Sequence, residues 1–283
     1  MQTKKTVPAS SLEHNKLNIV LPRNWDKVTE EQLKYYFKMR AVLSSNNELQ
    51  TCCFRRWAGI TETRQLRDGS YAMAIQQGDK LNFFKLELWQ IQSAVLALNW
   101  ISNEQPTEVI CVRNLWTNRT AVDKYLRMVP FEDYLAAEGF YQGYLHTRKS
   151  LEESQKNYGY QLEALQKQNR DLLRGLAGIL YPHKDNKEFN LKIEPWQEIA
   201  LITWWYSLKL YMARVFSSLF KTSDSTYTEE FDFTGSINAQ IRALTEGDVT
   251  KEAAVFKIDT HLALTELNEK AREASELRKR MKK

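Results

Sequence analysis

The stretch SINAQIRALTEGDVTKEAAVFKIDTHLALTELNEKAREASELRKRMKK, residues 236–283, decides the fold class because it contains both helix boundaries and helical spacing. Ser236 favours the start of one helix, and Gly247 favours its end. Asp248 or Thr250 can begin a second, long helix. Its apolar residues recur three to five positions apart on one side, at Val255, Ile258, Leu262, Leu267, Ala271, Ala274 and Leu277. The pattern predicts a long amphipathic C-terminal helix.

The apolar stripe of this predicted helix needs a surface to cover it. Such a stripe packs either on the core of its own chain or on another protein. The large residues Val255, Ile258 and Leu262 are expected to pack on the chain's own core, whereas the alanines further along bury little area. We therefore predict that the second half of the helix contacts a partner protein, through Ala271, Ala274, Leu277, Arg278 and Arg280.

Composition favours a mainly α-helical globular chain with several helices. The 283 residues include only 10 Gly and 6 Pro, so long runs lack the residues that punctuate turn-rich β structures. Hydrophobic residues make up 43% of the chain, which is enough to bury a core. Thr29 and Gln32 have the spacing of a capping box, in which each side chain bonds a backbone N–H of the other residue. This pair predicts the start of the first long helix.

One segment breaks the helical pattern. Residues 108–112 and 121–128 are β-branched or alternate in polarity, with turn-forming residues between them. The pattern predicts a small β-hairpin near 108–128. Residues 83–100 are apolar enough for a buried helix, and the short run 71–75 fits either a strand or a helix.

These elements predict three parts of the chain. They are a polar N-terminal arm over 1–24, a helical domain with the small hairpin over 25–235, and a C-terminal helical segment over 236–283. The expected fold is therefore a multi-helix globular domain followed by the long amphipathic helix.

Two apolar segments each allow an alternative interpretation. Residues 196–220 are the most apolar, but Lys209 and Arg214 interrupt them, and each charge costs about 2.5–3.5 kcal/mol at a bilayer centre. We predict a core helix and no membrane span, with attachment to a membrane surface as the alternative. Aromatic residues recur at helical spacing over 131–145. Core packing is the favoured interpretation there, and a platform for sugars or bases is the alternative.

The sequence lacks the patterns that mark catalytic and metal sites. Its four histidines and three cysteines do not stand at spacings that build a metal site on one element. Neither a Gly-x-Gly run nor a Gly-Lys-Ser/Thr run is present to bind phosphate. We therefore expect reduced thiols, no catalytic residue, no cofactor and no metal. An active site assembled only in three dimensions is the alternative that the sequence leaves open.

The C-terminal residues resemble a known group of proteins. The runs INAQIRALT (237–245), ALTELN (263–268) and KARE (270–273), with Gly247, Asp248, residues 250–252 and Asp259 between the first two, are similar to the C-terminal signature of uncharacterised proteins encoded in prophage structural and tail modules. No biochemical activity is attached to that group, so the resemblance implies no catalytic residue. It implies a role in particle morphogenesis, with other phage structural proteins as partners.

We therefore predict a non-enzymatic phage morphogenesis protein that acts by protein contact in tail or particle assembly, as a chaperone or a minor structural component. One alternative is a nucleic-acid-binding accessory protein, based on the cations of residues 278–283. That binding is expected to be weak, because the net charge is only +5 and cations at a helix C-terminus already interact with the helix dipole. Another is an inhibitor of a host protein. Residues 1–11 contain no secretory signal, so the expected location is the cytoplasm of the bacterial host, or the virion.

Overall fold

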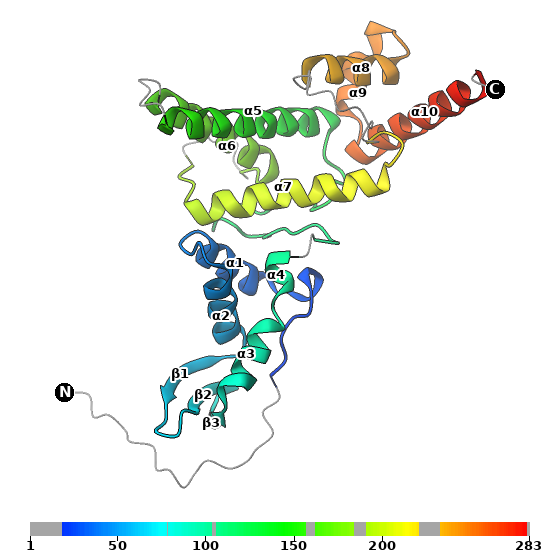
Figure 1. Cartoon of the computed structure of the whole chain (residues 1–283). Coiled ribbons are helices and arrows are strands. Elements are labelled where there is room, and N and C mark those ends of the chain that lie inside the picture. The colour runs from blue at the N-terminus through cyan, green and yellow to red at the C-terminus, as the bar shows by residue number, and fades with distance from the viewer. Residues whose placement is uncertain are drawn as a thin grey trace. The chain divides into compact units, whose positions relative to one another are not determined.

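A computed structural model of the chain shows two compact units, Met1–Pro106 and Thr107–Lys283, here called unit 1 and unit 2 (Figure 1). The chain is mainly α-helical with a small antiparallel sheet and a long C-terminal helix, so the predicted fold class is confirmed. The division after Pro106 differs from the expected boundaries after residues 24 and 235. The structure describes residues 19–77, 79–103, 106–156, 162–183, 191–220 and 233–281. Most of the predicted N-terminal arm lies outside them.

Unit 1 begins with helices and continues into a three-stranded sheet. Its elements are η2 (Trp25–Lys27), α1 (Glu30–Arg40), α2 (Asn46–Trp57), β1 (Ile60–Gln65), β2 (Tyr71–Gln77), β3 (Lys80–Leu86), α3 (Leu88–Leu96) and α4 (Trp100–Asn103). The predicted capping box is confirmed at the start of α1. The Gln32 N–H donates to Thr29 Oγ1 at 3.3 Å, and the Thr29 N–H donates to Gln32 Oε1 at 2.9 Å.

The sheet of unit 1 is an antiparallel meander in the order β1-β2-β3. It shows that residues 71–75 are a strand. The buried helix predicted over 83–100 begins only at Leu88, because 80–86 pair with β2, and α3 has no fully buried residue. Buried residues of the strands and of α2 form one hydrophobic cluster, which includes Met73 and Cys53. Burial raises the pKa of the Cys53 thiol to about 12, and all three cysteines of the chain are free.

Unit 2 contains the longer helices. They are α5 (Phe131–Lys156), α6 (Leu162–Leu180), α7 (Pro195–Val215), α8 (Phe233–Thr245), η3 (Val249–Lys251), α9 (Glu252–Lys257) and α10 (Thr260–Met281). Helix α7 is the predicted core helix, with Trp204 and Trp205 both 0% exposed. The aromatic face of α5 is buried against it, since the Tyr134 and Trp205 ring centroids lie 6.0 Å apart, which confirms the core interpretation of that face. Among the described helices, each is too short or too polar to cross a membrane.

The hairpin predicted near 108–128 is wrong, because these residues form an irregular segment with no named strand. Several of their backbone groups bond to α7 and to the end of α6 instead of to a second strand. The Ile110 N–H donates to Ser207 Oγ of α7 at 2.9 Å, and the Tyr181 hydroxyl donates to the Val112 carbonyl at 2.6 Å. Val112 is 2% exposed. The β-branched residues thus serve as core for α6 and α7, which local sequence cannot distinguish from strand pairing.

The long C-terminal helix starts later than expected. Gly247 has the predicted left-handed conformation, with φ of 84°, but Ser236 lies inside α8 and does not cap it. The predicted second helix is interrupted, because α9 ends at Lys257 and α10 begins at Thr260.

The break between α9 and α10 is bonded to residues at and just before the start of α5. The Thr260 N–H and hydroxyl both donate to the Val129 carbonyl, at 2.9 and 2.7 Å, and the Phe131 N–H donates to the Ile258 carbonyl at 2.9 Å. The Asp259 carboxylate accepts from the Met128 N–H and from the N–H of Leu262. We call this set of bonds the α9–α10 elbow. It sets the direction in which α10 leaves the start of α5.

Candidate interaction surface

Helix α10 is buried on one side in its first turns and exposed afterwards. The buried residues are Thr260, Ala263, Leu264 and Leu267. Leu262, which was expected to pack on the core, is 62% exposed, and Leu264 is buried at 0%. This correction follows from the elbow. Because the helix restarts at Thr260, the spacing counted from Val255 does not continue into α10.

The outer half of α10, residues 269–281, carries the predicted partner-binding residues and has no fully buried residue. Leu277 is 59% exposed and Met281 is 87% exposed. Ala274 and Met281 follow Leu267 by seven and fourteen residues, so they continue the buried side of the helix into solvent. Figure 1 shows this end of α10 pointing away from α5 and α6. The exposed apolar stripe is therefore Ala274, Leu277 and Met281; sequence reasoning omitted Met281.

Charges on the outer half of α10 fall into two groups. Arg272 bonds Glu269 at 2.6 Å and Glu276 at 3.1 Å, and the hydrogen bond to Glu269 raises the pKa of the guanidinium. Such pairs, three and four residues apart, favour the helical state of an exposed segment. By contrast, Glu273 and the predicted residues Arg278 and Arg280 form no ion pair with any described residue. These unpaired charges flank the apolar stripe.

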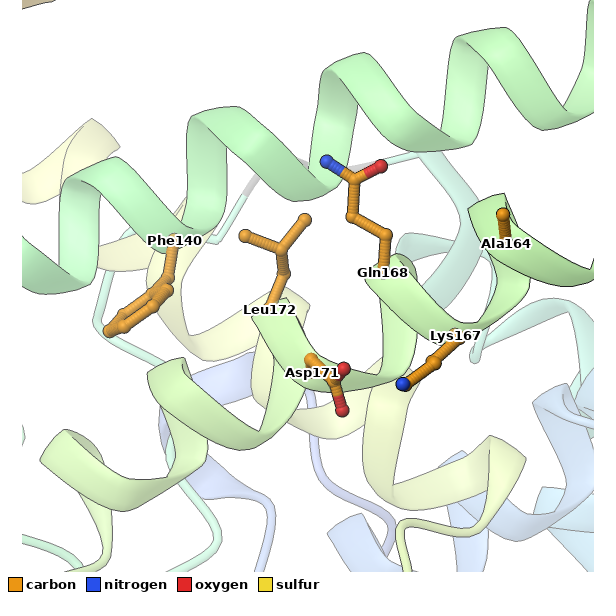
Figure 2. Close-up of a pocket in the computed structure, with 6 residues that line it drawn as sticks. All are labelled: Phe140, Ala164, Lys167, Gln168, Asp171 and Leu172. Carbon is orange, nitrogen blue, oxygen red and sulfur yellow. The ribbon is translucent and has the colours of Figure 1, made fainter. Parts of the chain in front are cut away.

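A second exposed apolar feature lies between α5 and α6. A groove with a volume of about 400 Å³ is lined by Phe140 of α5 and by Ala164, Lys167, Gln168, Asp171 and Leu172 of α6. We call it the α5/α6 groove. In Figure 2, Gln168 and Leu172 point toward α5, whereas Lys167 and Asp171 point away from it. The half-buried Phe140 and Leu172 are its large apolar lining residues, and exposed charges stand on its α6 side.

Two glycines bring α5 and α6 close together at the groove. A Cβ on Gly175 would lie 2.5 Å from the Phe140 ring, and one on Gly143 would lie 2.9 Å from Leu172 Cδ2. Each glycine thus receives the large side chain of the facing helix. Sequence reasoning missed this site. The available signal was an isolated glycine in each of two otherwise helical runs, which often marks close packing.

Replacing Gly175 by Ala is expected to destabilise unit 2 by about 1 kcal/mol. Alanine favours the helix by about 1 kcal/mol, but displacing three atoms of the Phe140 ring should cost roughly 1–3 kcal/mol. Gly143→Ala is the matched control, because the closest atom there is one methyl at the end of a flexible leucine. Urea denaturation measures both variants. A Gly175→Ala chain more stable than the wild type would show that the glycine does not set the helix spacing.

The buried titratable groups of unit 2 form a structural cluster. Glu138, 9% exposed, accepts from Trp205 Nε1 at 2.8 Å, from Gln142 Nε2 at 2.6 Å and from the Lys209 ammonium. Every donor is held by α5 or α7. The cluster joins these two helices through a carboxylate that already accepts three hydrogen bonds, which leaves capacity for about one more.

Within the described ranges, no three His, Cys, Asp or Glu side chains stand close enough to hold a metal ion. The predicted contact residues thus lie together on the outer half of α10, and the α5/α6 groove is a separate apolar surface of the same unit. Comparison of the chain with protein-family models, with curated proteins and with solved structures finds no match.

Proposed function

We propose that this chain acts by protein contact, without catalysis, in the assembly of a phage tail or particle, and that the outer half of α10 is the contact surface. The observation that carries the proposal is the exposed stripe of Ala274, Leu277 and Met281 on a helix whose first turns are buried. Large apolar side chains gathered on one exposed surface are typical of interaction sites. The assembly setting rests on the resemblance of residues 237–273 to proteins of prophage structural modules.

The nucleic-acid alternative is based on the exposed cations of the same helix. Arg278, Lys279 and Arg280 are all exposed, but they stand beside exposed apolar residues. Phosphate binding needs only the cations. Leu277 and Met281 have no role in it, so protein contact accounts for more of this surface.

A photo-crosslinking amino acid at position 277 tests the proposal. In cells that express the neighbouring particle genes together with this chain, position 277 is expected to crosslink to identified particle proteins, among which another copy of this chain counts. Position 279 is the control, because Lys279 lies about 200° round the helix from Leu277. Equal crosslinking from both positions, no crosslinking, or crosslinking to nucleic acid would contradict the proposal.

A further inference from the structure

We infer that the partner of the outer half of α10 is a second copy of this chain, and that the stripe of one copy binds in the α5/α6 groove of the next. The inference rests on the proposed function and names its partner. It joins two apolar surfaces of unit 2: the exposed Leu277 and Met281 on one helix, and the half-buried Phe140 and Leu172 in the groove.

The two surfaces agree in length. The groove residues of α6 run from Ala164 to Leu172, which is about 12 Å at 1.5 Å per residue. The stripe runs from Ala274 to Met281, which is about 10 Å by the same rise.

The two surfaces also agree in volume. An apolar cavity of about 150 Å³ holds a benzene ring. The groove volume of about 400 Å³ therefore has room for two large side chains such as Leu277 and Met281.

Their charges are complementary in one orientation. Lys167 precedes Asp171 along the α6 side of the groove, and Glu273 precedes Arg280 along one flank of the stripe. If α10 runs in the same direction as α6 and Glu273 faces Lys167, Arg280 lies about 4.5 Å beyond Asp171 along the helix axis, a gap that its long side chain can span. Lys167 forms no ion pair with a described residue, whereas Asp171 already bonds Arg174 at 3.0 Å. The pair of Glu273 with Lys167 should therefore contribute more to binding than the pair with Asp171.

The outer half of α10 cannot reach the groove of its own chain. The elbow holds the start of α10 beside the start of α5. From there α10 extends away from both α5 and α6 (Figure 1). The binding surfaces are therefore on different copies. Because they are two different surfaces, each copy can bind one neighbour at each end, and association continues into a ring or a filament.

A mixing experiment tests this arrangement. Leu277→Asp removes the stripe and leaves the groove intact, whereas Gln168→Arg fills the groove and leaves the stripe intact. Gln168 is exposed, and arginine has a similar helix propensity, so both variants should fold, which circular dichroism checks. In sedimentation velocity the wild type is expected to form species larger than dimers as its concentration rises. Each variant alone should associate roughly 10- to 100-fold more weakly.

The decisive result comes from the equimolar mixture of the two variants. It should form a dimer and nothing larger, because only one stripe and one groove remain functional. Self-association of Gln168→Arg at the wild-type level would overturn the inference, and so would a mixture that stays monomeric. A charge exchange checks the orientation: Lys167→Glu and Glu273→Lys should each weaken association, and the double variant should restore it.

The outcomes also separate this inference from the proposed function. A wild-type chain that stays monomeric while position 277 crosslinks to other particle proteins would overturn only the inference. A monomeric chain without crosslinks at position 277 would overturn both.

Discussion

A chain with Asp in place of Leu267 is expected to lose the cooperative folding of unit 2. Leu267 is 4% exposed in the buried part of α10. The substitution removes about 1.5–3 kcal/mol of apolar burial and adds a desolvation cost of several kcal/mol for the carboxylate. That sum is comparable with the total stability of a typical domain, about 5–15 kcal/mol. Thermal unfolding followed by tryptophan fluorescence measures the effect, because Trp204 and Trp205 are buried in this unit.

Leu277→Asp is the matched control for Leu267→Asp. It makes the same chemical change ten residues further along the same helix, at a residue that is 59% exposed. The expected change in the free energy of unfolding is within about 0.5 kcal/mol. Equal destabilisation by the two variants would mean that the outer half of α10 is core in the isolated chain, and the proposed contact surface would not exist.

Replacing Glu138 by Ala is expected to cost about 3 kcal/mol of unfolding free energy. The variant leaves the Lys209 ammonium and the Trp205 indole N–H without their acceptor. Removing one partner of a buried ion pair costs about 3–5 kcal/mol, and the lower end applies because the Lys209 side chain is 36% exposed. Urea denaturation gives the value.

A double-mutant cycle separates the charge of Glu138 from its hydrogen bonds. Glu138→Gln keeps an oxygen that can accept from the Trp205 indole, so its loss should be smaller than that of the alanine variant. Combined with Lys209→Met, it should lose less than the sum of the two single changes, because the single variants each leave an unpaired partner. Strict additivity would show that the Glu138–Lys209 pair does not couple α5 to α7.

Sequence patterns within a few residues were sufficient to predict the start of α1 and the core helix α7. The capping box at Thr29 depends on residues three apart, and the core helix α7 depends on a long apolar run with few charges. The strands were harder to predict. Strand β1 is buried only at Ile60, so no alternation of polar and apolar residues marks it. Residues 108–128 have strand-like composition but bond to the side chains of Ser207 in α7 and of Tyr181 just after α6, which are distant in sequence.

The candidate surface could be predicted in outline from the sequence. The stripe on the outer half of α10 follows from helical spacing, but the exposure of Leu262 depends on the restart of the helix at Thr260. The α5/α6 groove depends on contacts between helices, Phe140 on Gly175 and Leu172 on Gly143. No single segment contains both members of either contact, so a reading along the chain does not find the groove.

The α9–α10 elbow has a geometric consequence for the assembly inferred above. Each copy would add to the last by the same rotation and translation, and repetition of one such step sets the curvature of the whole array. The step depends on the angle between α10 and the helices that form the groove. Thr260, 0% exposed, holds that angle through its two bonds to the Val129 carbonyl. The elbow bonds, with those of this buried threonine among them, would thus influence whether the array closes after a few copies or extends without limit.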